Sequence, residues 1–89
     1  MKTFKCLRFK PYILKSFHAI MQFRNGYGIS VIGGNELDHC GSFYCNRDTY
    51  EVAVLKNGKV CYDTPIADDV LGWQTPDDVT RIMKQIQEL

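Results

Sequence analysis

Hydrophobic and polar residues alternate along the middle of the chain, in runs that are interrupted twice by an Asn-Gly pair. Residues 50–56 and 59–63 are two β-rich runs joined by Asn57-Gly58. This dipeptide suits the two positive-φ positions of a type I′ turn, so the pattern predicts a β-hairpin. The turn sets a register that pairs Lys56 with Lys59, Leu55 with Val60, Val54 with Cys61 and Ala53 with Tyr62.

Asn25-Gly26 separates residues 18–24 from residues 27–33, and the same turn chemistry predicts a second hairpin. Side chains alternate between the faces of a sheet, and here both faces carry apolar residues. One face is expected to meet a helix, and the other needs a cover from a loop, a second protomer or a partner. The predicted pairs are Arg24 with Tyr27, Gln22 with Ile29 and Ile20 with Val31, and the opposite face holds Ala19, Met21, Phe23, Ser30 and Ile32.

The segments that flank the hairpins carry weaker patterns. Residues 3–9 alternate and predict an edge strand that Pro11 ends, whereas residues 12–17 fit either a loop or the start of the next strand. Residues 33–48 predict a long loop, of a length that is often functional in a compact domain. Residues 64–73 predict a short capped turn in which Ile66, Val70 and Trp73 cover one edge of the core.

The carboxyl-terminal residues carry the clearest helix signal. Thr75 suits the N-cap, Pro76 the first helical position, and Asp77 with Asp78 the positive helix end. An apolar stripe follows at helical spacing: Val79, Ile82, Met83, Ile86 and Leu89. The sequence therefore predicts a single α+β domain over residues 1–89. Its four- or five-stranded antiparallel sheet contains two Asn-Gly hairpins, and one C-terminal helix packs on one face.

Composition narrows the class of protein. The chain has 89 residues, of which 45% are apolar and 24% charged, as in an ordinary globular domain. No apolar run is long enough to span a membrane, and Lys5, Arg8 and Lys10 interrupt the region where a secretory signal would lie. We therefore expect a cytoplasmic protein with no membrane contact.

Charge is divided unevenly along the chain. Residues 1–35 carry six basic residues and no acid, whereas residues 36–89 carry ten acids and five basic residues. The net charge of +1 disfavours a dedicated nucleic-acid binder, which usually has a large basic excess. The two halves either attract each other in the folded chain or leave a basic surface for an acidic partner.

Four cysteines are present: Cys6, Cys40, Cys45 and Cys61. Cys6 and Cys61 fall in apolar alternations and are interpreted as small buried hydrophobic residues. His39-Cys40 and Cys45 are the cluster that most resembles metal ligands, and a Cys40–Cys45 disulfide is the other candidate. In a reducing compartment we expect unbound loop thiols instead, and no metal or cofactor is predicted.

Two acidic pairs, Asp68-Asp69 and Asp77-Asp78, have the composition of a magnesium or acid–base site. Both pairs lie at predicted helix starts, where carboxylates are favoured by the helix dipole, so capping is the preferred interpretation. No catalytic constellation is recognised, and the chain is not predicted to be an enzyme.

Several blocks resemble a family of small phage and prophage proteins that are mostly hypothetical. The blocks are Asn25-Gly-Tyr-Gly-Ile-Ser-Val-Ile32, Tyr50-Glu-Val-Ala-Val-Leu55, Tyr62-Asp-Thr-Pro-Ile-Ala-Asp-Asp-Val-Leu-Gly72, the start of the helix at Asp77-Asp78-Val79, and Ile86-Gln-Glu-Leu89. They cover about three quarters of the chain and carry no catalytic signature. The resemblance implies a phage-encoded cytoplasmic protein and implies no activity.

The function expected from these features is that of a non-enzymatic phage accessory protein that binds a host or phage protein, to inhibit host defence or redirect host machinery. Its candidate surface is the sheet face away from the helix with Phe43 and Tyr44, and Trp73 is a possible anchor although packing is preferred for it. That sheet face would also suit a homodimer. The alternative is a sheet that binds single-stranded nucleic acid through Lys5, Arg8, Arg24 and Tyr27. A small metal-dependent enzyme ranks third.

Overall fold

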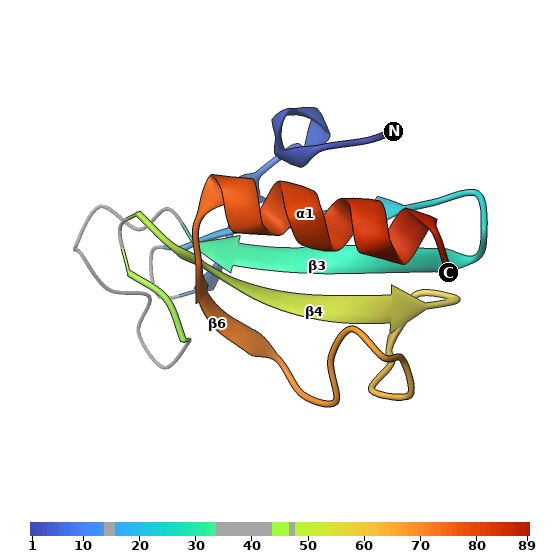
Figure 1. The fold of residues 1–89 in the computed structure, drawn as a ribbon. Helices are drawn as coiled ribbons and strands as arrows, with labels where there is room; N and C mark the ends of the chain where they lie inside the picture. Colours follow the sequence, from blue (N-terminus) through green and yellow to red (C-terminus); the bar gives the residue numbers. More distant parts are fainter. Residues whose placement is uncertain (14–15, 34–43, 47) are drawn as a thin grey trace.

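The computed structural model describes residues 1–13, 16–33, 44–46 and 48–89. Within them, six strands form one antiparallel sheet and a single α-helix crosses one of its faces (Figure 1). The strand order is β1 (Lys10–Pro11), β2 (Phe17–Gln22), β3 (Tyr27–Gly33), β4 (Tyr50–Lys56) and β5 (Lys59–Val60), and β6 (Leu71–Gln74) pairs with the other end of β4. With α1 (Pro76–Gln87) on the sheet, the predicted α+β class is confirmed.

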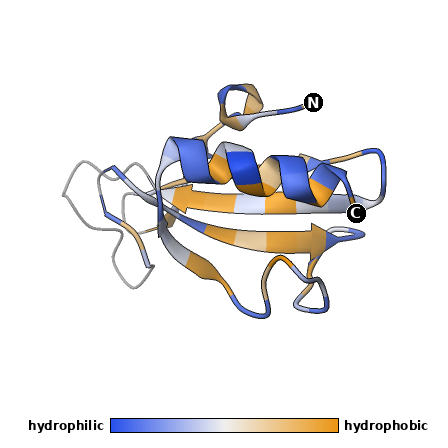
Figure 2. Cartoon of the chain, in the orientation of Figure 1, coloured by the Kyte–Doolittle hydropathy of each residue, from blue (hydrophilic) through white to orange (hydrophobic). Residues whose placement is uncertain are grey.

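The core lies between α1 and the central strands. Figure 2 shows hydrophilic residues on the side of α1 that is turned away from the sheet, and largely hydrophobic strands behind it. Four members of the predicted apolar stripe are buried, since Val79, Ile82, Met83 and Ile86 are at most 2% exposed. The fifth, Leu89, lies beyond the end of α1 and is 40% exposed, so its predicted place in the buried stripe is wrong. The four buried side chains pack against alternate strand residues, Ala19, Ile29, Val31, Val52 and Val54. Each such side chain contributes about 1.5–3 kcal/mol through burial.

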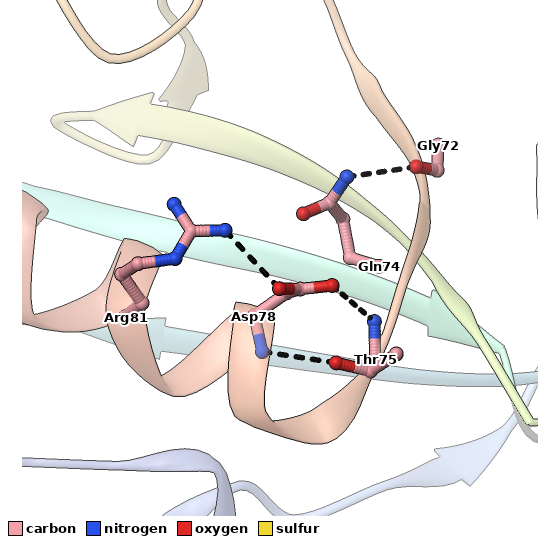
Figure 3. Close-up of polar contacts among 5 residues, drawn as sticks. All are labelled: Gly72, Gln74, Thr75, Asp78 and Arg81. Carbon is pink, nitrogen blue, oxygen red and sulfur yellow. Dashed lines mark hydrogen bonds and ion pairs between the residues drawn. The ribbon is translucent and has the colours of Figure 1, made fainter.

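The start of α1 is fixed by a capping box (Figure 3). The backbone N–H of Asp78 donates to Thr75 Oγ1 (3.2 Å), and the backbone N–H of Thr75 donates to Asp78 Oδ2 (3.0 Å). The hydrogen bond from the Thr75 backbone, followed by those from the Thr75 side chain and Arg81, lowers the pKa of the Asp78 carboxyl. The predicted helix start is confirmed.

The Asn57-Gly58 hairpin forms as predicted. Asn57 (φ 52°) and Gly58 (φ 82°) both have positive φ, and Lys56 pairs with Lys59 and Leu55 with Val60. The strand β5 is only two residues long, although the backbone N–H of Cys61 still donates to the carbonyl of Val54 (2.8 Å).

The hairpin at Asn25-Gly26 forms with a different loop, so its predicted register is wrong by one residue. Gln22 lies opposite Gly28 and Ile20 opposite Ser30. The backbone N–H of Phe23 donates to the carbonyl of Tyr27 (2.8 Å), which closes a three-residue loop whose last residue, Gly26, has a φ of 86°. Such a loop is a turn followed by one left-handed residue, and it needs positive φ only there.

This shift decides which apolar residues meet the helix, because a slip of one residue exchanges the two faces of a strand. Ala19 and Met21 of β2 lie opposite Val31 and Ile29 of β3, on the side of the core. The face away from α1 therefore carries His18, Ile20, Ser30 and Ile32.

The amino-terminal segment contains no strand over residues 3–9. It forms a 3-10 helix, η1 (Phe4–Cys6), beside α1, where the backbone N–H of Phe4 donates to Thr80 Oγ1 (3.1 Å). Phe4 and Phe9 pack around Tyr50, with ring centroids 5.1 and 5.6 Å from it. The predicted edge strand is therefore wrong. Its apolar residues alternate because the aromatic ones fill one end of the core. Pro11 lies within β1, which is tolerated because β1 is an edge strand.

Residues 64–70 contain no helix, and the chain enters β6 directly after them. Ile66 and Leu71 pack against the core, whereas Trp73 is 59% exposed, so the predicted packing role of Trp73 is wrong. No helix in the described ranges is long and apolar enough to cross a membrane.

Candidate functional site

Two exposed aromatic side chains meet at the β6 edge of the sheet. Tyr44 precedes β4 and Trp73 lies in β6, and their ring centroids are 5.6 Å apart with an interplanar angle of 45°. Their exposed fractions are 53% and 59%. Both residues belong to the predicted partner-binding set. The third member, Phe43, lies outside the described residues.

A β-bulge presents Trp73. Tyr50 pairs with Gln74 and Val52 with Leu71, so two β6 residues, Gly72 and Trp73, lie opposite Glu51 alone. Trp73 has a φ of 51°, in the left-handed region that bulky side chains rarely adopt. Bulges commonly redirect a side chain next to a functional site, and this one directs an indole into solvent.

Hydrogen bonds join the segment at Tyr44 to the bulge. The backbone N–H of Trp73 donates to the carbonyl of Tyr44 (2.8 Å), and the backbone N–H of Tyr44 donates to Glu51 Oε2 (2.8 Å). The Gln74 side chain donates to the carbonyl of Gly72 (2.8 Å) (Figure 3). Hydrogen bonds therefore fix the backbone of Tyr44 and of the bulge that carries Trp73.

Gly72 allows the close approach of the two segments. A Cβ atom at this position would lie 2.6 Å from Tyr44 Cβ and 3.0 Å from its carbonyl oxygen. Any larger residue would push Tyr44 away from β6 and separate the rings. Gly72, Glu51 and Gln74 were not among the predicted site residues, although a glycine within a strand is itself a signal for a bulge.

The contact between the two rings contributes little net stability once the backbone strain at Trp73 is included. A left-handed conformation costs an L-residue roughly 1–2 kcal/mol, and an aromatic pair contributes about 0.5–1.5 kcal/mol. The two terms nearly cancel, and an exposed pair excludes less water than a buried one. Residues held in strained conformations are found disproportionately at functional sites.

The cysteines differ from the expectation of unbound loop thiols. Cys45 is 5% exposed and disulfide-bonded, whereas Cys6 and Cys61 are free and only partly buried. A disulfide-bonded Cys45 cannot supply a thiolate to zinc, so the zinc interpretation of this cluster is wrong. His39 and Cys40 lie outside the described residues, so the Cys40–Cys45 pairing stays a hypothesis. Over the ranges that the structure describes, no three His, Cys, Asp or Glu side chains are grouped so as to hold a metal ion.

The two acidic pairs have different roles. Asp78 forms the capping box and an ion pair with Arg81 (3.2 Å), as the capping interpretation predicts. Asp69 instead accepts a hydrogen bond from the backbone N–H of Val70 (2.7 Å) in a segment without a helix. Helix capping is therefore wrong for Asp68-Asp69.

The four residues of the predicted nucleic-acid set come from separate elements of the structure. Arg24 lines a cavity with Lys2 at the carboxyl-terminal end of α1, and Arg8 lines a different cavity beside β1. Tyr27 is partly buried against the core and lies under Lys56 Nζ (5.5 Å). Lys5 is exposed on η1. The two arginines therefore line different cavities, and the aromatic member of the set is partly buried.

The chain was compared with protein-family models, curated proteins and solved structures, and none of them matched.

Proposed function

We propose that this chain is a non-enzymatic protein-binding domain that uses the Tyr44–Trp73 pair as its anchor. The observation that carries the proposal is the exposure of both rings on a braced bulge. Tyrosine and tryptophan dominate the energetics of protein interfaces because they offer large, rigid contact areas at small entropic cost. The proposed role as a phage accessory protein in the host cytoplasm rests on the sequence resemblance alone.

The charge around the pair favours a partner that presents a basic side chain. Glu51 accepts its hydrogen bond from Tyr44, and Asp48 lies close enough to Tyr50 to raise the pKa of its phenol, after the larger effect of burial. Residues 36–89 as a whole carry an excess of acids. An arginine or lysine placed over the tryptophan ring would gain cation–π attraction beside these carboxylates.

Capture from host lysate with substituted proteins tests this proposal. The tagged chain, Trp73→Ala, Tyr44→Ala and Tyr62→Ala are compared with and without nuclease. Tyr62 is the matched control because it is another exposed tyrosine (42%) outside the pair. We expect a nuclease-resistant protein to be retained by Tyr62→Ala and reduced at least tenfold by either substitution in the pair, which is typical of interface anchors.

Stability is measured on the same variants. Loss of capture with an unchanged melting temperature supports the proposal, and loss that follows a fall in melting temperature contradicts it. Capture that disappears with nuclease would favour the nucleic-acid alternative. Self-association that Trp73→Ala abolishes in sedimentation would instead identify a second copy of this chain as the occupant.

A further inference from the structure

A cavity lies beside β1 and β2, at the edge of the sheet opposite to the Tyr44–Trp73 pair. It has a volume of about 430 Å³, within the roughly 300–1,000 Å³ range of small-ligand sites. Lys10 pairs with His18 across β1 and β2, and His18 and Ile20 point away from the core that Ala19 enters. The cavity therefore opens on the sheet face that α1 does not cover. Its described lining residues are Arg8, Lys10, Pro11, Tyr12, His18 and Ile20.

One part of the lining is aromatic and apolar. The rings of Tyr12 and His18 have centroids 4.5 Å apart, and Ile20 beside them is 58% exposed. His18 Nε2 shares a hydrogen bond with Ser30 Oγ (2.8 Å), and the backbone N–H of Tyr12 donates to the carbonyl of Ser16 (2.8 Å). These bonds fix the aromatic part of the lining, on which the flat ring of a ligand can stack.

The other part of the lining is cationic. Arg8 and Lys10 are exposed, and the described lining includes no carboxylate. Neither cation forms an ion pair within the part of the chain that the structure describes. Burial lowers the pKa of His18, so its imidazole is neutral near pH 7. The positive charge in the cavity therefore comes from Arg8 and Lys10.

We propose that this cavity binds a nucleoside monophosphate, with the base stacked beside Tyr12 and Ile20 and the phosphate held by Arg8 and Lys10. Arginine suits phosphate because its guanidinium donates two parallel hydrogen bonds, and lysine adds a second point charge. The ligand is a single nucleotide because Lys5, Arg24 and Tyr27, which would extend a track for a strand, do not line the cavity. This site does not depend on the protein-binding proposal.

Calorimetric titration of the full chain tests the site, with AMP as the probe and adenosine and inorganic phosphate as its two halves. We expect AMP to bind at least tenfold more tightly than either half. Arg8→Gln, Lys10→Gln and Tyr12→Leu are each expected to weaken AMP about tenfold, the size of one charge-assisted or stacking contact. Lys5→Gln is the matched control, because Lys5 is an exposed cation that does not line the cavity, and it should leave the affinity unchanged.

Three results would overturn the proposal. These are no heat from AMP or UMP at millimolar concentration, equal affinity for AMP and inorganic phosphate, or equal weakening by Lys5→Gln and Arg8→Gln. A short oligonucleotide is titrated in parallel, and binding of the oligonucleotide without binding of AMP would replace the single nucleotide with a strand. Arg8→Gln and Lys10→Gln change exposed side chains, so the test stands even if Tyr12→Leu fails to fold.

Discussion

Trp73 combines two properties that rarely occur together, a left-handed backbone and a large exposed side chain. The backbone conformation is set by the bulge opposite Glu51, where β6 contributes one residue more than β4. Glycine would meet this conformational requirement at lower cost. The backbone conformation of β6 therefore does not explain the indole side chain. An exposed indole agrees with the proposed binding surface.

Two substitutions at this position separate the backbone from the ring. Trp73→Ala and Trp73→Gly both remove the contact with Tyr44, but only glycine relieves the left-handed strain. We expect Trp73→Gly to be more stable than Trp73→Ala by about 1 kcal/mol, or about 4–8 °C in melting temperature for a domain of this size. Thermal unfolding followed by circular dichroism measures the difference.

Gln74 is the control for this comparison, because it is the next residue of β6 and does not have a positive φ. Among the described non-glycine residues, positive φ is confined to Asn57 and Trp73. At an extended position glycine is less favourable than alanine, so Gln74→Gly should be less stable than Gln74→Ala. The same order at both positions would show that Trp73 is not strained.

At the scale of elements, two hairpins with the same Asn-Gly turn residues differ in structure. In the turn before β5, Asn57 itself supplies a positive φ, and its side chain makes no hydrogen bond within the described residues. In the turn before β3, the Asn25 side chain donates to the carbonyl of Ile86 (2.8 Å) and accepts from the backbone N–H of Tyr27 (3.1 Å). Asn25 thus connects the hairpin to the carboxyl-terminal end of α1.

Matched glycine substitutions distinguish these two roles. Asn25→Gly should lower the free energy of unfolding by about 0.5–1.5 kcal/mol for each hydrogen bond lost, because a helix carbonyl then lacks its donor. Asn57→Gly should be nearly neutral, because glycine adopts the same backbone conformation readily. Urea denaturation with an unchanged m-value measures both. Equal losses would mean that the hydrogen bond from Asn25 to the carbonyl of Ile86 contributes no stability.

At the scale of the whole molecule, the division of charge along the chain becomes a division between surfaces. Arg8 and Lys10, from the basic part, line the cavity beside β1 and β2. Tyr44 and Trp73, from the acidic part, lie beside β4 and β6. Strands β3 and β4 separate the two edges of the sheet, so the two surfaces share no described residue.

This separation predicts independent effects on the two surfaces. Trp73→Ala should reduce capture of the proposed protein partner and leave the affinity for AMP unchanged, and Arg8→Gln should do the reverse. The effects of substitutions at distant sites without shared contacts are usually additive. The double variant should therefore lose protein capture and AMP affinity by the same factors as the two single variants. A single variant that alters both would show that the surfaces are coupled.

The sequence by itself determined the elements whose signals are local. The capping residues and apolar spacing of α1 placed the helix and its buried face, and Asn57-Gly58 placed one hairpin with its register. These features succeed because turn and cap chemistry acts over a few neighbouring residues. The α+β class followed from the same local patterns. Tyr44 and Trp73 were also singled out from the sequence, but not their contact.

The tertiary structure decided what depends on distant segments. The register at Asn25 follows from packing of Ile29 and Val31 against α1 and from the bond between Asn25 and Ile86, which no local pattern contains. The strand β6 and its bulge exist because β4 leaves an open edge beyond β5, and Gly72 lets Tyr44 approach that edge. The cavity beside β1 likewise forms only when Lys10 and His18 meet across paired strands. Burial and pairing between remote residues set these features, and the order of residues along the chain does not display them.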